Sequence, residues 1–412
     1  MRITEFEIRM IDFIKRHFGV ILLVIITIFA LVLRYKMRDF QSNDFINCLS
    51  NWYEYLKTVG LRNTFASGGI GDYNCPYIIL LWVLTKIPVS SLFMIKLISV
   101  VFDFGLAIVS ALVVRRIMSS KKVDRKKRTF STIVTYSIII LLPTIMLNSA
   151  LWAQCDAIYA FFVVFSIYFL LGKRYTLSFI LLGCAFAFKL QFIFVLPIYL
   201  LVYLKNKEFS VLNFLLIPTM LIVLSLPALL CGFPFIKIFE IYFLQIGEYK
   251  FLTMNMFNIY QVFGGTYEYM SLVGYSLCVA IFGVLFYYVM RFYKKVETFQ
   301  MVTLMLFSVL VCVCFLPSMH ERYAYMAVVL AVIYFVVGNG SALILVLMEG
   351  LSLLAYCAYL FEIPVSGYSL LGLIPVAMVL YLSKQIRYYP YMKKNQNYDS
   401  RCSSWNKLRN NN

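Results

Sequence analysis

The polar segment 34–77 lies between apolar runs and carries several carboxylates, among them Asp39, Asp44 and Asp72. Connections between membrane helices are usually short, so a polar segment of this length needs a functional reason. A single ionised carboxylate can accept a proton from a hydroxyl group, and Asp44 is the candidate for this base. Two alternatives stay open: Asp39 or Asp72 could be the base, and Asp44 could instead cap the helix expected at 46–59.

Cationic side chains that could hold an anion occur later in the chain. His320, Glu321 and Arg322 form a proline-led turn just after an apolar run. The planar fork of an arginine suits phosphate oxygens, and a histidine can donate to the same atoms. Lys189 lies inside an apolar stretch, where a lysine is costly unless it is paired or faces a wet cavity. His320, Arg322 and Lys189 are therefore candidates for phosphate binding.

Each of these cations also has a simpler interpretation. Arg322 could extend its side chain to lipid headgroups, and His320 could merely fill a loop. Lys189 could pair with a carboxylate such as Asp156 and serve the fold alone.

Aromatic and amide side chains occur together in the segment 147–156, which contains Trp152, Gln154 and Asp156. Aromatic faces and amide groups suit sugar binding, so these three residues are candidates for the wall of a sugar pocket. Asp72 is a candidate to bind a hydroxyl of an acceptor. The alternative for Trp152 is a position in the aromatic belt at the membrane surface.

A metal site is not indicated by the sequence, because it shows no compact cluster of carboxylates or histidines. The ten cysteines have no metal-ligand or redox spacing. We therefore expect no metal and no cofactor, and we do not favour a disulfide between Cys48 and Cys75.

The composition predicts the elements that must position these residues. Hydrophobic residues make up 62% of the chain and charged residues 14%, and the mean hydropathy is +0.84. A chain of 412 residues cannot hide so much apolar surface inside one water-soluble core. The sequence therefore predicts an all-α polytopic membrane protein, with residues 1–412 forming one integral membrane domain.

Twelve apolar runs are candidates for membrane helices. They lie near residues 18–33, 92–114, 130–147, 157–171, 177–190, 192–204, 211–230, 271–290, 301–316, 323–337, 342–360 and 370–382. A further run at 77–87 is closed by Pro88, and its eleven residues would span about 16 Å, roughly half of the hydrocarbon layer. We expect it to be a half-buried helix, and we expect 46–59 to be an interfacial helix anchored by Trp52, Tyr53 and Tyr55.

Basic residues occur in short clusters between the apolar runs. The densest cluster, 115–128, holds eight Lys and Arg residues and one Asp. Such clusters predict cytoplasmic connections. Both termini and the basic tail 383–412 are then inside, and the segment 34–77 is outside. The same pattern explains the net charge of +18 without nucleic acid as a partner.

Polar segments then gather on the extracytoplasmic face of a multi-pass plasma-membrane protein. They are 34–77, 147–156, the turn around 189–191, 231–270 and 317–322. The cytoplasmic connections are short and contain neither a Gly-rich phosphate loop nor the aspartate pair of nucleotide-sugar enzymes. A donor carried by a membrane lipid fits this arrangement better than a soluble nucleotide donor.

Several motifs follow the first polar segment in a fixed order. They are NCPYIILLWVL, IKLISVVFDFG, LLPTIMLNSALWAQCDAIYAFF, FKLQFIFVLPIYLL and PSMHERYAY. Together they resemble the GT-C superfamily of membrane glycosyltransferases, and more narrowly bacterial proteins related to the mannosyltransferase that adds the second mannose of the GPI anchor. The chain also resembles the dolichyl-phosphate glucosyltransferases, which carry a His-Glu-Lys motif where this sequence has His320, Glu321 and Arg322.

The resemblance implies a GT-C fold and the transfer of a mannose-like hexose from a polyprenyl-phosphate donor to an acceptor hydroxyl, with inversion at the anomeric carbon. In this family the base is an aspartate early in the first outer loop, and Asp44 occupies that position. The acceptor would be a glycan, a glycolipid or a protein in cell-envelope assembly. The sequence identifies neither the sugar nor the acceptor.

Two other classes of function stay open at this stage. A flippase or exporter of lipid-linked saccharides would share the basic loops, and the intramembrane carboxylates Asp103 and Glu349 could then couple ions or protons. Transporters usually show internal repeats and broken helices, and no convincing repeat is seen here. A polysaccharide polymerase or ligase would use a pyrophosphate lipid donor. For Asp103 and Glu349, buried structural hydrogen bonding is an equal alternative.

Overall fold

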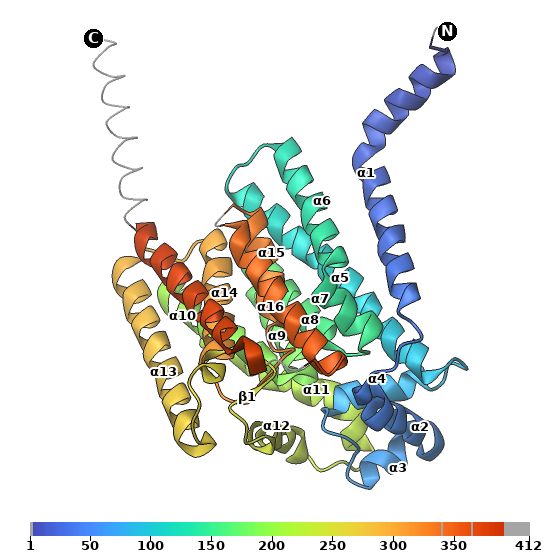
Figure 1. Cartoon of the computed structure of the whole chain (residues 1–412), viewed down its shortest axis with the longest axis vertical. Coiled ribbons are helices and arrows are strands. Elements are labelled where there is room, and N and C mark those ends of the chain that lie inside the picture. Colours follow the sequence, from blue (N-terminus) through green and yellow to red (C-terminus); the bar gives the residue numbers. More distant parts are fainter. Residues whose placement is uncertain (1–2, 339–340, 364–365, 391–412) are drawn as a thin grey trace.

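The structure is a computed structural model that describes residues 3–338, 341–363 and 366–390, and nearly all of these residues are helical. Figure 1 shows a bundle of helices with the first helix at one side. Each of the twelve apolar runs predicted from the sequence is helical, which confirms the all-helical class. Of the predicted tail 383–412, residues 383–390 belong to the last helix, and the rest lie outside the described residues.

The bundle contains long helices and short turns of other helical types. Its first half consists of α1 (Glu5–Lys36), α5 (Ser91–Ser120), α6 (Arg125–Leu141), α7 (Pro143–Met146), η2 (Leu147–Leu151), α8 (Asp156–Leu171) and α9 (Tyr175–Phe188). Its second half consists of η3 (Leu190–Val195), α10 (Leu196–Asn206), η4 (Val211–Leu215), α11 (Leu216–Leu230), α13 (Tyr267–Phe292), α14 (Thr298–Phe315), α15 (Tyr325–Val336), α16 (Ala342–Leu360) and a last helix, Gly367–Pro390, that begins within η6 (Ser366–Gly372).

Shorter elements lie between these helices. They are η1 (Phe45–Leu49), α2 (Ser50–Val59), α3 (Leu61–Ala66), α4 (Cys75–Leu84), α12 (Lys237–Glu248), η5 (Ile259–Gln261) and two strands, β1 (Thr253–Met254) and β2 (Met319–His320), which pair in parallel.

Seven helices of the described residues are long and apolar enough to cross a membrane. An eighth span results if α6 and the segment Pro143–Leu151 are counted as one helix, which bends by 50°. The bend has a local cause: Leu142 leaves the helical conformation before Pro143, whose ring disfavours a helical residue in front of it. Four other predicted runs form shorter apolar helices, α8, α9, η3 with α10, and α15.

The buried fraction of the long helices indicates whether water or lipid surrounds the bundle. Only 11% of the apolar window of α1 is buried, whereas 83% of that of α14 is buried. Phe18, Val24 and Ile28 of α1 are among its many exposed large apolar side chains. A helix that is apolar on all sides and yet exposed needs a lipid environment. The fold is therefore that of a helical membrane protein.

The two ends of the bundle differ in their charge. At one end, ion pairs and hydrogen bonds connect the turns that carry basic residues. Lys173 pairs with Glu208 at 3.1 Å, and Lys121 donates to the carbonyl of Val337 at 3.1 Å. The turn between α5 and α6 lies at this end, at the top of Figure 1, and α2, α3 and α12 lie at the other. The grouping of basic turns predicted from the sequence is therefore present in the fold.

The first polar segment folds into short helices. The predicted helix 46–59 is present as η1 and α2, and the predicted helix 77–87 is present as α4, which ends earlier at Leu84. Tyr53 is buried and donates to the carbonyl of Leu84 at 2.9 Å, so its predicted role as an interfacial anchor is wrong. Cys48 and Cys75 are free thiols.

Candidate active site

A cavity of about 460 Å³ lies at the end of the bundle that carries α2, α3 and α12. Its wall includes residues from each of the five polar segments predicted to meet, for example Asp44, Asp72, Gln154, Lys189, Glu248 and Arg322. His320 also borders it. The fold therefore brings together residues from segments that are far apart in the chain.

Asp44 is fixed at the cavity by three neutral donors. Its Oδ2 accepts hydrogen bonds from Trp152 Nε1 at 2.9 Å and from Gln154 Nε2 at 2.5 Å, and its Oδ1 accepts one from the hydroxyl of Tyr359. The residue is half-buried, so the carboxylate remains accessible from the cavity. These donors orient a carboxylate that no cation touches within 4 Å among the described residues.

The capping role considered for Asp44 belongs to its neighbour Ser42. Asp44 makes no side-chain cap hydrogen bond to the following helix. Instead, Ser42 Oγ accepts the backbone N–H of Phe45 at 3.2 Å and donates to the carbonyl of Trp152 at 2.8 Å. Ser42 therefore anchors the chain just before Asp44 and leaves the carboxylate free for other partners.

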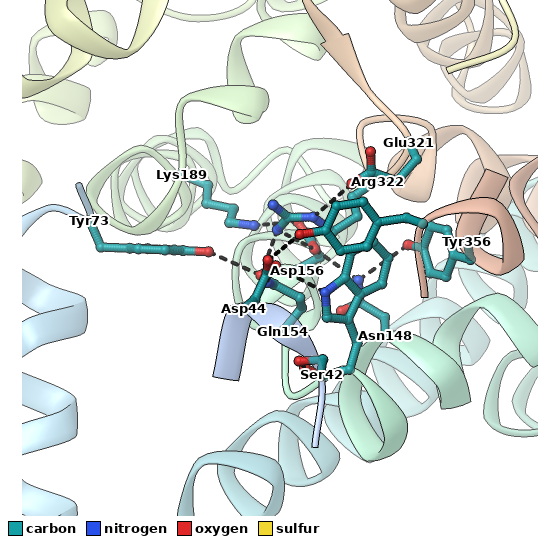
Figure 2. Close-up of polar contacts among 12 residues, drawn as sticks. Ser42, Asp44, Tyr73, Asn148, Gln154, Asp156, Lys189, Glu321, Arg322 and Tyr356 are labelled. Atoms are coloured by element: carbon teal, nitrogen blue, oxygen red, sulfur yellow. Dashed lines mark hydrogen bonds and ion pairs between the residues drawn. The ribbon is translucent and has the colours of Figure 1, made fainter. Parts of the chain in front are cut away.

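Gln154 joins Asp44 to the cationic side of the cavity, as Figure 2 shows. Its amide nitrogen donates to Asp44, and its Oε1 accepts from Arg322 Nη1 at 2.5 Å and from the hydroxyl of Tyr73 at 3.1 Å. One side chain thus sets the relative positions of the carboxylate and the guanidinium group. Both ends of the glutamine are occupied, so its orientation is fixed by the hydrogen-bond pattern.

Two cations share the buried carboxylate of Asp156. Lys189 Nζ lies 2.6 Å from Oδ1, and Arg322 Nη1 lies 3.7 Å from Oδ2, which also accepts from Asn148 at 2.8 Å. The pairing of Lys189 with Asp156 that the sequence left open is therefore present. Lys189 and Arg322 still border the cavity, whereas Asp156 lies behind them and does not. One carboxylate thus holds two cations at the wall of the same cavity.

Arg322 belongs to a packed turn, not to the protein surface. Its Nε lies 3.4 Å from Glu321 Oε1, and its guanidinium carbon lies 5.3 Å from the centre of the Trp152 ring system. The side chain is 14% exposed, so the alternative that it reaches out to lipid headgroups is wrong. Trp152 is fully buried, which also excludes a position in an aromatic belt.

The turn with Arg322 is held by the long segment 231–270, a role that the sequence did not predict. The strand β1 of this segment pairs with β2, so Met254 lies opposite His320. Ser318 has a φ of 57° and donates through its hydroxyl to the carbonyl of Tyr249 at 2.8 Å. These contacts aim the turn at the cavity.

The protonation of His320 and Glu321 follows from their surroundings. Burial lowers the pKa of His320 to about 3, and the charges of Arg322 and Lys189 act in the same direction. Burial raises the pKa of Glu321 to about 7, although Arg322 opposes this shift. Near neutral pH, His320 is therefore a neutral imidazole with one N–H to donate, and Arg322 and Lys189 supply the positive charge.

Of the other residues predicted for the site, some border the cavity and others do not. Asp72 borders the cavity, and its backbone carbonyl accepts from Gln245 at 2.5 Å. Asp39 points away from the site: its side chain is 78% exposed and pairs with Arg38 at 3.1 Å, and it does not border the cavity. Trp152 does not border the cavity either, so its predicted place in a sugar-pocket wall is wrong, and it acts through Asp44. The same correction applies to Asp156.

The two intramembrane carboxylates have structural partners away from this cavity. Asp103 pairs with Arg34 at 2.9 Å and accepts from Ser149 Oγ at 2.5 Å, and Glu349 accepts the backbone N–H of Thr144 at 2.8 Å. The sequence did not predict the partner of Asp103, because Arg34 lies on a different helix, α1. Tyr359 was not predicted either, since a tyrosine in an apolar run carries no signal of its contacts.

No group of three or more His, Cys, Asp and Glu side chains suited to a metal ion occurs in the described part of the chain. A scan against protein-family models and a search of curated proteins give no match to this chain.

Proposed function

We propose that this protein is an inverting glycosyltransferase that moves a hexose from a polyprenyl-phosphate donor to an acceptor hydroxyl. The observation that carries the proposal is the bridge of Gln154 between the Asp44 carboxylate and the Arg322 guanidinium group in one cavity. The transfer needs a base to accept the proton of the acceptor and a cation to hold the departing phosphate, and these two groups lie on either side of one amide.

The proposed reaction forms one bond and breaks one bond. Asp44 accepts the proton of the acceptor hydroxyl, whose oxygen attacks the anomeric carbon of the donor sugar. The bond from that carbon to the phosphate oxygen breaks, and the lipid phosphate leaves with the electron pair. Attack opposite to the departing phosphate inverts the anomeric carbon. A phosphate leaves as a stable anion, so the reaction needs no general acid.

The cationic wall would hold the departing phosphate. Arg322 can use the N–H groups that its protein partners leave free, and Lys189 adds a second positive charge from the same side. The neutral imidazole of His320 can donate one further hydrogen bond. Asp156 lies behind the cations, Glu321 borders the cavity beside Arg322, and the two carboxylates keep the cations in position.

The site would lie on the extracytoplasmic face of a GT-C fold. We infer this face from the basic turns, which gather at the opposite end of the bundle. We also infer twelve crossings, in which the shorter helices α8, α9, α10 with η3, and α15 complete the count begun by the longer helices. Buried neighbours shield the ends of these short helices, and α15 is almost entirely buried.

A transfer assay in membranes tests the proposal. Membranes with the wild-type protein and labelled polyprenyl-phosphate hexoses should release lipid phosphate and form a glycosylated acceptor. Asp44→Asn should lower the rate by about 100-fold or more, because the base is lost. Asp39→Asn is the matched control, since it removes the same charge from the same segment outside the cavity.

Two results would contradict the proposal in different ways. Full activity of Asp44→Asn would remove Asp44 as the base. Failure to transfer sugar from any polyprenyl-phosphate donor, together with passage of lipid-linked saccharide across vesicle membranes, would favour an exporter. The structural partners of Asp103 and Glu349 weigh against ion coupling through these residues.

A further inference from the structure

A second cavity, of about 620 Å³, lies at the opposite end of the bundle, between α5, α6 and the end of α8. Its wall carries Arg115, Arg116 and Arg128, together with the hydroxyl groups of Ser119 and Ser120. No acidic side chain borders it, and none lies within 4 Å of these three guanidinium groups in the described ranges of the chain. Three like charges around one space form an electrostatic site for an anion.

Two other cations at this end do have a carboxylate partner. Lys173 and Lys295 both pair with Glu208, which also accepts the hydroxyl of Tyr175 at 2.6 Å. The protein leaves the arginines to face the cavity without a protein counter-charge.

Arg116 is fixed in position before any ligand arrives. Its Nη1 donates to the carbonyl of Tyr168 at 2.6 Å, and its guanidinium carbon lies 3.8 Å from the centre of the Tyr168 ring. Gly172 permits this position, because a Cβ at that residue would lie 1.9 Å from Arg116 Nη1. Arg128 is held by a hydrogen bond to Ser119 Oγ at 3.0 Å. Such preorganisation lowers the cost of binding.

The surroundings of the cavity favour a lipid over a soluble anion. On α5, Leu112 borders the cavity, and Ile108, one turn away on the same face, is 51% exposed. On α8, Phe161 and Phe165 are half-buried and lead along the helix to Tyr168. Apolar side chains therefore continue along α5 and α8 from the cationic pocket, which suits a molecule with a phosphate head and hydrocarbon chains.

We propose that this pocket, formed by Arg115, Arg116 and Arg128, binds the phosphate of an anionic phospholipid. The planar guanidinium groups would grip the phosphate oxygens in pairs, and the chains of the lipid would lie against α5 and α8. The site is separate from the Asp44 cavity, and the proposal does not depend on the transferase activity.

Thermal unfolding of the purified full chain in neutral detergent tests the proposal. Phosphatidylglycerol should raise the unfolding midpoint of the wild type, whereas phosphatidylcholine should not. The triple variant Arg115→Gln, Arg116→Gln, Arg128→Gln should lose the shift and bind the lipid roughly tenfold or more weakly, given the strength of each basic contact. The triple variant Arg125→Gln, Lys126→Gln, Lys127→Gln is the control, since it removes equal charge from exposed positions outside the cavity.

Gly172→Ala provides a second test that changes no charge. The added methyl group must displace the guanidinium group of Arg116, which is the end of a flexible side chain, so the fold should persist. This variant should bind phosphatidylglycerol more weakly than the wild type. Equal shifts in the pocket variant and the charge control would overturn the proposal. An equal shift with inorganic phosphate alone would overturn the assignment to a lipid.

Discussion

The buried charges around Asp103 and those around Asp156 lie in different surroundings. Arg34 and Asp103 pair between α1 and α5 with side chains only 3% and 0% exposed, and Arg34 also donates to the carbonyl of Ile140 at 2.9 Å. Arg322 and Lys189 share Asp156, which is equally buried, but both of these cations border the Asp44 cavity. Asp103 and Asp156 are alike in burial and differ in what their partners can reach.

Burial and pairing therefore do not by themselves mark a functional charge. All three guanidinium nitrogens of Arg34 donate to protein groups, namely Asp103 and the carbonyls of Ala30 and Ile140, although Arg34 also borders a separate cavity of about 360 Å³ beside α1 and α5. In the cluster around Asp156, both cations, Lys189 and Arg322, border the Asp44 cavity. We therefore assign structure to the first cluster and chemistry to the second, and this assignment predicts opposite effects of mutation.

The largest expected effect is on stability. Arg34→Gln leaves the carboxylate of Asp103 buried with Ser149 as its main remaining donor, and it should lower the free energy of unfolding by about 3–5 kcal/mol. Transfer activity per folded molecule should stay near that of the wild type. Thermal unfolding in detergent and the transfer assay measure the two quantities.

The double variant Arg34→Met with Asp103→Leu is the control for this prediction. Replacing both charges by apolar groups should restore most of the lost stability, since no uncompensated charge remains. A stable Arg34→Gln protein without transfer activity would reverse the assignment of the two clusters.

The second effect is on catalysis. Arg322→Gln should lower the transfer rate by about 100- to 1,000-fold, as expected when a group that stabilises charge in the transition state is removed. The unfolding midpoint should fall less than in Arg34→Gln, because Asp156 keeps Lys189 at 2.6 Å and Glu321, whose pKa is raised to about 7, can take up a proton. If the variant lost stability and activity in parallel, the cluster would be structural, like the pair of Arg34.

The smallest effect concerns the pH dependence of stability. The pKa of His320 falls from 6.5 to about 3, so the unfolded chain binds a proton that the folded protein lacks, and stability rises with pH between these values. The pKa of Glu321 rises from 4.5 to about 7, so the folded protein holds the extra proton and stability falls with rising pH over that window.

The two contributions oppose each other where the windows overlap, from pH 4.5 to 6.5. His320→Gln should make the slope of the unfolding free energy against pH more negative, and Glu321→Gln should make it more positive, each by up to about 1.4 kcal/mol per pH unit. Thermal unfolding in buffers across this range measures both slopes. Slopes that change in the same direction would show that the surroundings of these residues differ from those described.

The sequence predicted the helices well because a segment that crosses a bilayer must be long, apolar and helical. All twelve apolar runs are helical, and so are the predicted short helices in the first polar segment. It also predicted that Asp44, Gln154 and Arg322 would belong to one site, since these polar residues flank apolar runs at the same end of the bundle. The strand pairing between β1 and β2 was not predictable, because two residues per strand leave no periodic pattern.

Partners across helices were the main failure of prediction. Trp152 and Asp156 were expected in a pocket wall, and they lie one layer behind it. Nothing in the composition of the apolar run 342–360 shows that the hydroxyl of Tyr359 reaches Asp44. Such contacts depend on how far each helix is rotated and on where neighbouring helices cross, which a single run does not record.

Hydropathy and charge were enough to predict the helical class, the positions of the helices and the separation of basic turns from acidic segments, because they act on each segment independently. Which buried charges meet Asp44 at one cavity follows only from how the helices pack. Lys189 and Arg34 look alike in the sequence, since each is a cation at the edge of an apolar run, but only packing brings Lys189 to the cavity that Asp44 also borders, whereas Arg34 borders a different one. Which cavity a charged side chain borders depends on how the whole bundle is assembled, and no local pattern of residues encodes it.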